Sequence, residues 1–143
     1  MSDPNKMYGP YANRDDAAKA GFKKVKGNPR RDNFEFAFWV VMKPNPGKKP
    51  SFCFTEPQTS DEHNMVRIKA PPGLNPDYVH AFCHTHPTDS GTSGVFFGYD
   101  DKLHFRESRK YFHIIAWYLL NSNGDILVAN DETQFLGGRP IKW

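Results

Sequence analysis

The spacing of hydrophobic positions changes several times along the chain, and each change predicts a new element. After Asn13, a residue suited to cap a helix, apolar residues recur at helical spacing and predict an amphipathic helix over about residues 14–25. The residues that set this spacing are Ala18, Phe22 and Val25. A second helix is expected over residues 100–112, with Leu103 and the ring of Phe112 or Tyr111 on its inner side.

Runs that are dense in aromatic and β-branched residues predict the strands. The run at residues 33–42 is typical of a strand buried on both faces, and Glu35 is its one charged residue. Further strands are expected at residues 51–55, 65–69, 77–86, 113–120 and 125–130, with a hairpin turn at Asn123-Gly124. Together these elements predict an α+β fold, a mostly antiparallel (mixed) β-sheet with flanking helices.

The ends of the chain differ from this pattern. Residues 1–12 are expected to be an N-terminal arm or junction without regular structure, and residues 13–143 a single domain. The Leu-Gly-Gly at residues 136–138 is expected to be a turn and not a cleavage site. The N-terminus lacks the basic and apolar regions of a secretory signal, and no apolar run is long enough to cross a bilayer. We therefore expect a soluble protein, cytoplasmic as expressed, with no membrane partner.

Composition narrows the classes of partner. A formal net charge of +3 is too small a bias to predict nucleic acid as a partner. Twelve Phe, six Tyr and three Trp supply large buried areas from few positions, as in a sheet-rich core. Two cysteines, Cys53 and Cys83, lie in predicted strands and are expected to be inert thiols, although an oxidising compartment leaves a bond between them open.

The motif His84-Thr85-His86-Pro87 carries the candidate chemistry. Residues two apart in a strand share a face, so the two imidazoles can converge on one ion. Cys83 then faces the other way, which argues against a Cys–His nucleophilic pair. A third ligand is expected from Asp100 or Asp101, which follow a loop at residues 88–94 and begin the second helix. The spacing alone is equally compatible with two histidines that only pack and form hydrogen bonds.

The remaining histidines lack such an arrangement and are expected to be structural or exposed. They are His63, His80, His104 and His113. If the strand is unbroken, His80 shares the face of His84 and would support the site from behind.

Glu35 favours the metal interpretation, because a lone carboxylate in an apolar strand is costly to bury unless something pairs with it or uses it. Beside a metal, a carboxylate can take the proton of an attacking water and return it to the leaving group. The alternative is an edge position or a salt bridge to Arg30 or Arg31.

The order of a strand Glu, then H-x-H-P, then an Asp at a helix start resembles the signature of the JAB/MPN (JAMM) metallopeptidases. More closely, the chain is similar to the JAB-like domain of unknown function found at the C-termini of bacterial Rhs and other polymorphic toxins. The similar segments are "YANRDDAAKAGF", "NFEFAFWVV", "FCFTEP", "HAFCHTHP", "FGYDDK" and "YLLNSNGDILVA". The resemblance covers about residues 11–130 and implies a JAB/MPN-like fold with a cytidine-deaminase-like layout.

The resemblance also implies a function. Zn²⁺ would be held by His84, His86 and Asp101, with a position left for water, and Glu35 would be the general acid/base. The expected activity is zinc-dependent hydrolysis of an amide in a protein or peptide substrate. The expected setting is a bacterial toxin or effector domain, released from a larger carrier protein upstream, delivered into a target cell and neutralised by a cognate immunity protein.

The chain departs from the family pattern at Gly98, where the family has a serine whose hydroxyl helps to hold the oxyanion. Loss of one such donor typically costs about 10² or more in rate. Ser93 and Tyr99, together with Ser90, are the candidates to replace it. The stretch after Pro87 is also longer than in the deubiquitinating members, which argues against ubiquitin-type substrates.

Two alternative functions stay open. One is a catalytically degenerate, metal-supported binding domain. The other is a toxin acting on nucleic acid, with His84 or His86 as base near a metal held by Asp100 and Asp101.

Overall fold

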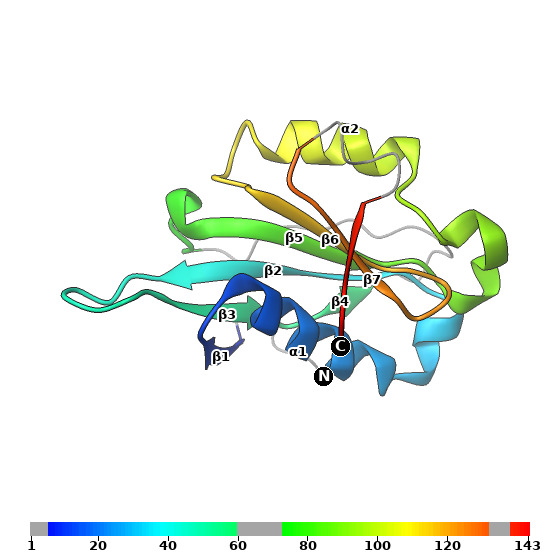
Figure 1. Ribbon diagram of the computed structural model, residues 1–143, viewed down its shortest axis with the longest axis horizontal. Coiled ribbons are helices and arrows are strands. Elements are labelled where there is room, and N and C mark those ends of the chain that lie inside the picture. The colour runs from blue at the N-terminus through cyan, green and yellow to red at the C-terminus, as the bar shows by residue number, and fades with distance from the viewer. Residues whose placement is uncertain (1–5, 60–72, 132–137) are drawn as a thin grey trace.

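One β-sheet with a helix against each face forms the framework (Figure 1). The computed structural model describes residues 6–59, 73–131 and 138–143. Within these ranges the strand order is β1 (Met7–Tyr11), β3 (Ser51–Thr55), β2 (Phe36–Lys43), β5 (Val79–Thr85), β6 (Ala116–Leu120), β7 (Ile126–Ala129) and β8 (Arg139–Ile141). The short β4 (Gln58–Thr59) also pairs with β2. The predicted α+β class with a mostly antiparallel sheet is confirmed.

The parallel pair of β5 and β6 decides where the site lies. Parallel neighbours need a crossover connection. Here the crossover contains η3 (Thr88–Gly94), a 3₁₀ segment, and α2 (Tyr99–Ser108). It therefore returns the start of α2 to the sheet, close to the end of β5.

Helix α1 (Arg14–Lys26) forms where the hydrophobic spacing predicts it. The side chain of Asn13 caps it, because its Oδ1 accepts a hydrogen bond from the N–H of Asp16 at 2.8 Å. Acidic residues occupy the first turn and basic residues the last turn, which matches the helix dipole.

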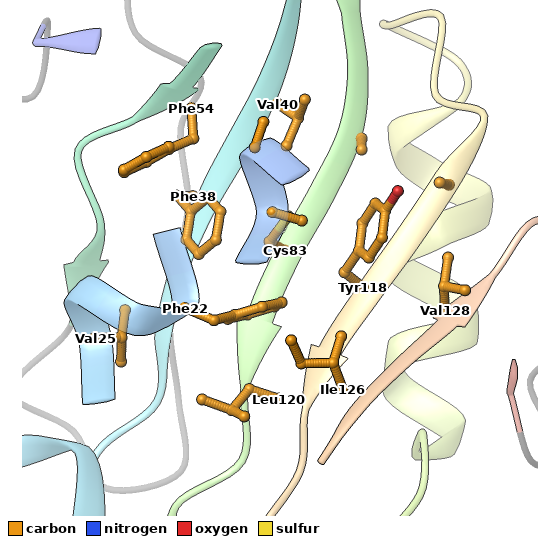
Figure 2. Packing of buried hydrophobic residues seen from close by; sticks show 14 of the residues in the cluster. Phe22, Val25, Phe38, Val40, Phe54, Cys83, Tyr118, Leu120, Ile126 and Val128 are labelled. Atoms are coloured by element: carbon orange, nitrogen blue, oxygen red, sulfur yellow. The ribbon is translucent and has the colours of Figure 1, made fainter. Parts of the chain in front are cut away.

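The core on the α1 side is built from aromatic and branched side chains of α1 and of five strands (Figure 2). Phe22 of α1 meets Phe38 of β2 edge to face, with ring centroids 5.1 Å apart. A Cβ on Gly21 would collide with the Phe38 ring, so glycine is required for this close approach. The labelled members of the cluster in Figure 2 are Phe22, Val25, Phe38, Val40, Phe54, Cys83, Tyr118, Leu120, Ile126 and Val128.

The opposite face carries a second core, to which α2 contributes Phe105. The prediction that Leu103 faces inward is wrong, since Leu103 is 37% exposed and Phe105 is fully buried. The helix starts at Tyr99, and residues 101, 105 and 108, which share one face of it, contact or are buried against the sheet. Tyr111 is exposed, whereas Phe112 packs against this core.

Several expected boundaries need correction. Residues 7–11 are not an unstructured arm, because they form β1 and pair antiparallel with β3. β2 begins at Phe36, so Glu35 precedes the strand instead of lying within it. The expected loop at residues 88–94 is a 3₁₀ segment with a kink at Gly91. β8 at the C-terminal end was not expected. The strand expected at residues 65–69 and His63 lie outside the described residues.

The two cysteines are free and project from opposite faces of the sheet. Cys83 belongs to the core beneath α1, as do Phe52 and Phe54, so Cys53 between them faces the other side. A disulfide needs the two Cβ atoms close together, which this arrangement prevents. Within the described ranges, none of the helices has the length and apolar character that crossing a membrane requires.

Candidate metal centre

The three residues implied as ligands lie together at the end of β5 and the start of α2. One possible ligand atom from each of His84, His86 and Asp101 lies within 4.8 Å of the others. The Nε2 of His84 is 2.9 Å from Oδ1 of Asp101, and the Nε2 of His86 is 3.3 Å from Oδ2. Both histidines are buried, with exposed fractions of 3% and 9%.

Backbone carbonyls fix the orientation of both rings. The Nδ1 of His84 is 3.2 Å from the carbonyl oxygen of Tyr118 in β6. The Nδ1 of His86 is 3.1 Å from the carbonyl oxygen of Gly94 in η3. A carbonyl can only accept, so each Nδ1 carries a proton, and in the neutral form of each ring Nε2 then keeps its lone pair. Both lone pairs are thereby left for a ligand near Asp101.

Asp101 is held in place by the helix that it begins. It is the third residue of α2, and its Oδ2 accepts the backbone N–H of Gly98, the N-cap residue, at 2.6 Å. A carboxylate at this position satisfies an otherwise unpaired helix donor and interacts favourably with the dipole. The carboxylate is therefore fixed before any ligand binds.

The electrostatics of the cluster are strongly coupled. Burial alone would lower the pKa of His84, but the carboxylates of Asp101 and Glu35 and the carbonyl of Tyr118 together outweigh burial and raise this pKa. Burial alone would raise the pKa of Asp101, but the two imidazoles hold it well below its usual range. Without metal, the cluster is thus a buried ion pair.

The geometry fits a small divalent cation. The Nε2 of His84 is buried and has no hydrogen-bond partner, because its contact with Asp101 is close but misaligned. A buried polar atom without a partner calls for a ligand at that point. Ligand atoms of a tetrahedral zinc lie roughly 3.4 Å apart, and the two distances from imidazole nitrogen to carboxylate oxygen are 2.9 Å and 3.3 Å. Two imidazole nitrogens and a carboxylate suit catalytic zinc and also non-haem Fe(II).

Glu35 lies beside this cluster. Ala37 pairs with His84 across β2 and β5, so Glu35, two residues earlier, is placed on the face that carries both histidines. Its side chain is half-buried, and its negative charge contributes to the raised pKa of His84. The carbonyl of Glu35 accepts the hydroxyl of Thr59 at 2.5 Å, which anchors its backbone to β4.

The candidates for an oxyanion donor lie in the crossover. The hydroxyl of Ser93 donates to the carbonyl of Ser90 at 2.7 Å, and that of Ser90 donates to the carbonyl of Pro87 at 2.5 Å. Tyr99 is 75% exposed at the first position of α2. The catalytic roles expected of Ser93 and Tyr99 stay predictions. A Cβ on Gly98 would meet Oδ2 of Asp101 at 3.6 Å, an ordinary contact, so a serine fits there.

His80 does not support the site from behind. The pairing of β2 and β5 shifts register next to it, between Val40 and Val41. Its ring therefore faces Phe52 and His113, with centroids 6.4 Å and 5.2 Å away. His104 and His113 are exposed, as expected.

Two anchors of the site could not be found from the sequence. The carbonyls of Tyr118 and Gly94 are backbone groups, which leave no trace in residue type. At position 94 the residue type gives one indirect sign that the backbone is closely packed, because a Cβ there would collide with the side chain of Ser90.

Comparison of the chain with family models, with curated proteins and with solved structures finds no match. The site thus has the composition of a class of candidate cation centres, with two buried histidines and one carboxylate, and no family is assigned. The resemblance to the JAB-like toxin domains, with its carrier and immunity protein, stays a prediction.

Proposed function

We propose that the protein is a zinc-dependent amide hydrolase of the metallopeptidase type, with His84, His86 and Asp101 as metal ligands and Glu35 as general acid/base. The observation that carries the proposal is the shared orientation of the two histidines. Each Nδ1 is engaged by a carbonyl and each Nε2 faces Asp101. Packing alone would not require the Nε2 atoms of both rings to converge on one carboxylate.

Each residue then has a task. When bound, zinc supplies a Lewis acid and lowers the pKa of a water molecule at its open position. Asp101 provides the negative charge among the ligands, and the Nδ1 hydrogen bonds keep both imidazoles in the ligating tautomer. Glu35, next to β2 on the same face, accepts the proton of the attacking water and passes it to the departing amine.

The second candidate is a metal-supported binding domain that does not turn over, and Gly98 favours it. The hydroxyls of Ser90 and Ser93 already donate to backbone carbonyls, and Tyr99 is largely exposed. If no other donor holds the oxyanion, the rate falls by about 10² or more.

Metal analysis and a cleavage assay separate these candidates. Purified protein should contain about one metal per chain, and His86→Ala should lose most of it. Elemental analysis also decides between zinc and iron. A proteome-derived peptide library, searched by mass spectrometry for new amino termini, should be cleaved by the wild type.

Glu35→Gln is the matched control for the assay. It keeps the shape of the side chain but cannot accept a proton, so it should retain metal and lose turnover by about 10² or more. Cleavage by Glu35→Gln at the wild-type rate would rule out its role as the acid/base. Full metal content with no cleavage by the wild type would favour the binding domain.

A further inference from the structure

Arg31 is a buried cation next to the candidate metal centre. It lies in η1 (Pro29–Asp32), the 3₁₀ segment that follows α1, and is 5% exposed. Burial lowers the pKa of Arg31, and Asp32 acts in the opposite direction. Removing a guanidinium from water is costly, so its position calls for a specific set of partners.

Those partners are two backbone carbonyls. Nη1 donates to the carbonyl of His86 at 2.5 Å, and Nη2 donates to the carbonyl of Asn121 at 2.7 Å. The carbonyl of His86 belongs to a candidate metal ligand, and the carbonyl of Asn121 belongs to the turn between β6 and β7. Arg31 therefore joins the end of β5 to that turn.

The same turn also holds the ring of His86. The N–H of Ser122 donates to the carbonyl of Gly94 at 3.0 Å, and that carbonyl is the partner of the His86 Nδ1. The side chain of Asn121 supports the turn by accepting the N–H groups of Asn123 and Asp125. The backbone and the ring of His86 are thus fixed by one connected unit that includes Arg31.

His84 has a different support. It lies within β5 between two paired strands, and its Nδ1 contacts the carbonyl of Tyr118 in β6. His86 lies one residue beyond the end of β5. Its backbone N–H donates to the carbonyl of Leu120 at 3.0 Å and continues the hydrogen bonding between β5 and β6. His86 thus depends on groups outside the strand for its orientation.

We propose that Arg31 is a positioning residue, which holds the carbonyl of His86 so that the Nε2 of His86 faces Asp101, and thereby sets the affinity of the site for its metal. This inference rests on the metal site of the proposed function.

A simple electrostatic view makes the opposite prediction. Removing a positive charge near a bound dication reduces repulsion and should tighten metal binding. Removing a residue that orients a ligand should weaken binding, typically by about 10–100-fold. The sign of the change therefore separates positioning from charge.

The test measures zinc and cobalt affinity by competition with a chromophoric chelator, below the melting temperature of every variant. Arg31→Met should weaken binding by about tenfold or more and alter the visible spectrum of the cobalt protein. Arg31→Lys keeps the charge but lacks the two-pronged donor, so its affinity should fall between wild type and Arg31→Met. Lys24→Met, an exposed cation on α1, is the matched control and should leave affinity unchanged.

The outcomes are distinguishable. If Arg31→Met binds metal as tightly as the wild type or more tightly, Arg31 does not position His86, even if the melting temperature falls. Should Arg31→Met fail to fold, Arg31→Lys decides, and wild-type affinity and cobalt spectrum in that variant would overturn the inference. If the wild type binds neither ion, the proposed function fails together with this inference.

Discussion

Replacing Asp101 by asparagine separates the ligand role of this side chain from its structural role. The oxygen of an asparagine can still accept the N–H of Gly98, which Asp101 accepts at 2.6 Å. Its amide nitrogen would then take the place of Oδ1, which faces the Nε2 of His84, and donate to that nitrogen. The metal-free variant should therefore still fold, without the ionic part of the wild-type contact, whereas metal binding should weaken because an NH₂ group is a poor ligand.

The size of the loss follows from the number of ligands. Structural zinc sites bind with about 10–16 kcal/mol, which is about 2.5–4 kcal/mol for each of four ligands. Three protein residues converge here, so losing one should cost at least about 2.5 kcal/mol, or roughly 60-fold in Kd. Loss of the hydrogen bond from the Gly98 N–H would lower the free energy of unfolding by about 1 kcal/mol, but asparagine retains this hydrogen bond.

The assay is a zinc titration against a chromophoric chelator, with thermal melting in the presence of EDTA. Asp100→Asn is the matched control, since it removes the adjacent charge and should leave Kd within about threefold. Equal zinc affinity in Asp101→Asn and wild type would refute the ligand assignment. A large loss in Asp100→Asn alone would move the ligand by one residue.

Two further predictions concern catalysis and pH. Gly98→Ser places a hydroxyl at the N-cap position of α2, where the backbone is extended and a Cβ has room. It should leave metal affinity unchanged and raise the rate of peptide hydrolysis by up to about 10². Gly98→Ala should show no gain in rate, and a gain in both variants would contradict an oxyanion role. In metal-free protein, the raised pKa of His84 stabilises the fold below the ordinary histidine pKa near 6.5, and this stability is lost as pH rises through the raised value. The lowered pKa of Asp101 stabilises the fold above about pH 3.9, and that contribution is lost as pH falls toward the lowered value. Urea unfolding with EDTA should thus show higher stability at pH 5.5 than at pH 9, a difference that Asp101→Asn should reduce; an equal reduction in Asp100→Asn would argue against the His84–Asp101 pair.

Periodicity predicted the central elements correctly, because their burial is strong. α1 shows a clear helical spacing and a capping Asn13, and β5 is a run of buried residues that ends in the motif. The i, i+2 rule then placed His84 and His86 on one face, as the structure has them. These features are local, so the sequence carries them.

The features that sequence analysis missed depend on distant contacts. β1 and β8 are short edge strands that contain proline. They are strands because they pair with β3 and β7, and not because of their own sequence pattern. The inner face of α2 is set by how the helix packs on the sheet, which buries Phe105 and leaves Leu103 partly exposed. The ring anchors and the Arg31 contacts use backbone carbonyls, for which residue type gives no signal.

The hydrogen bond between Gly98 and Asp101 has a consequence for how an ion is acquired. One carboxylate oxygen is tied to the start of α2, and each imidazole is tied to a carbonyl, by contacts that do not involve a cation. We therefore expect the centre to form as the chain folds and to be loaded afterwards. Its occupancy should then follow the free concentration of metal in the surroundings, and chelation should strip the ion reversibly without unfolding the protein.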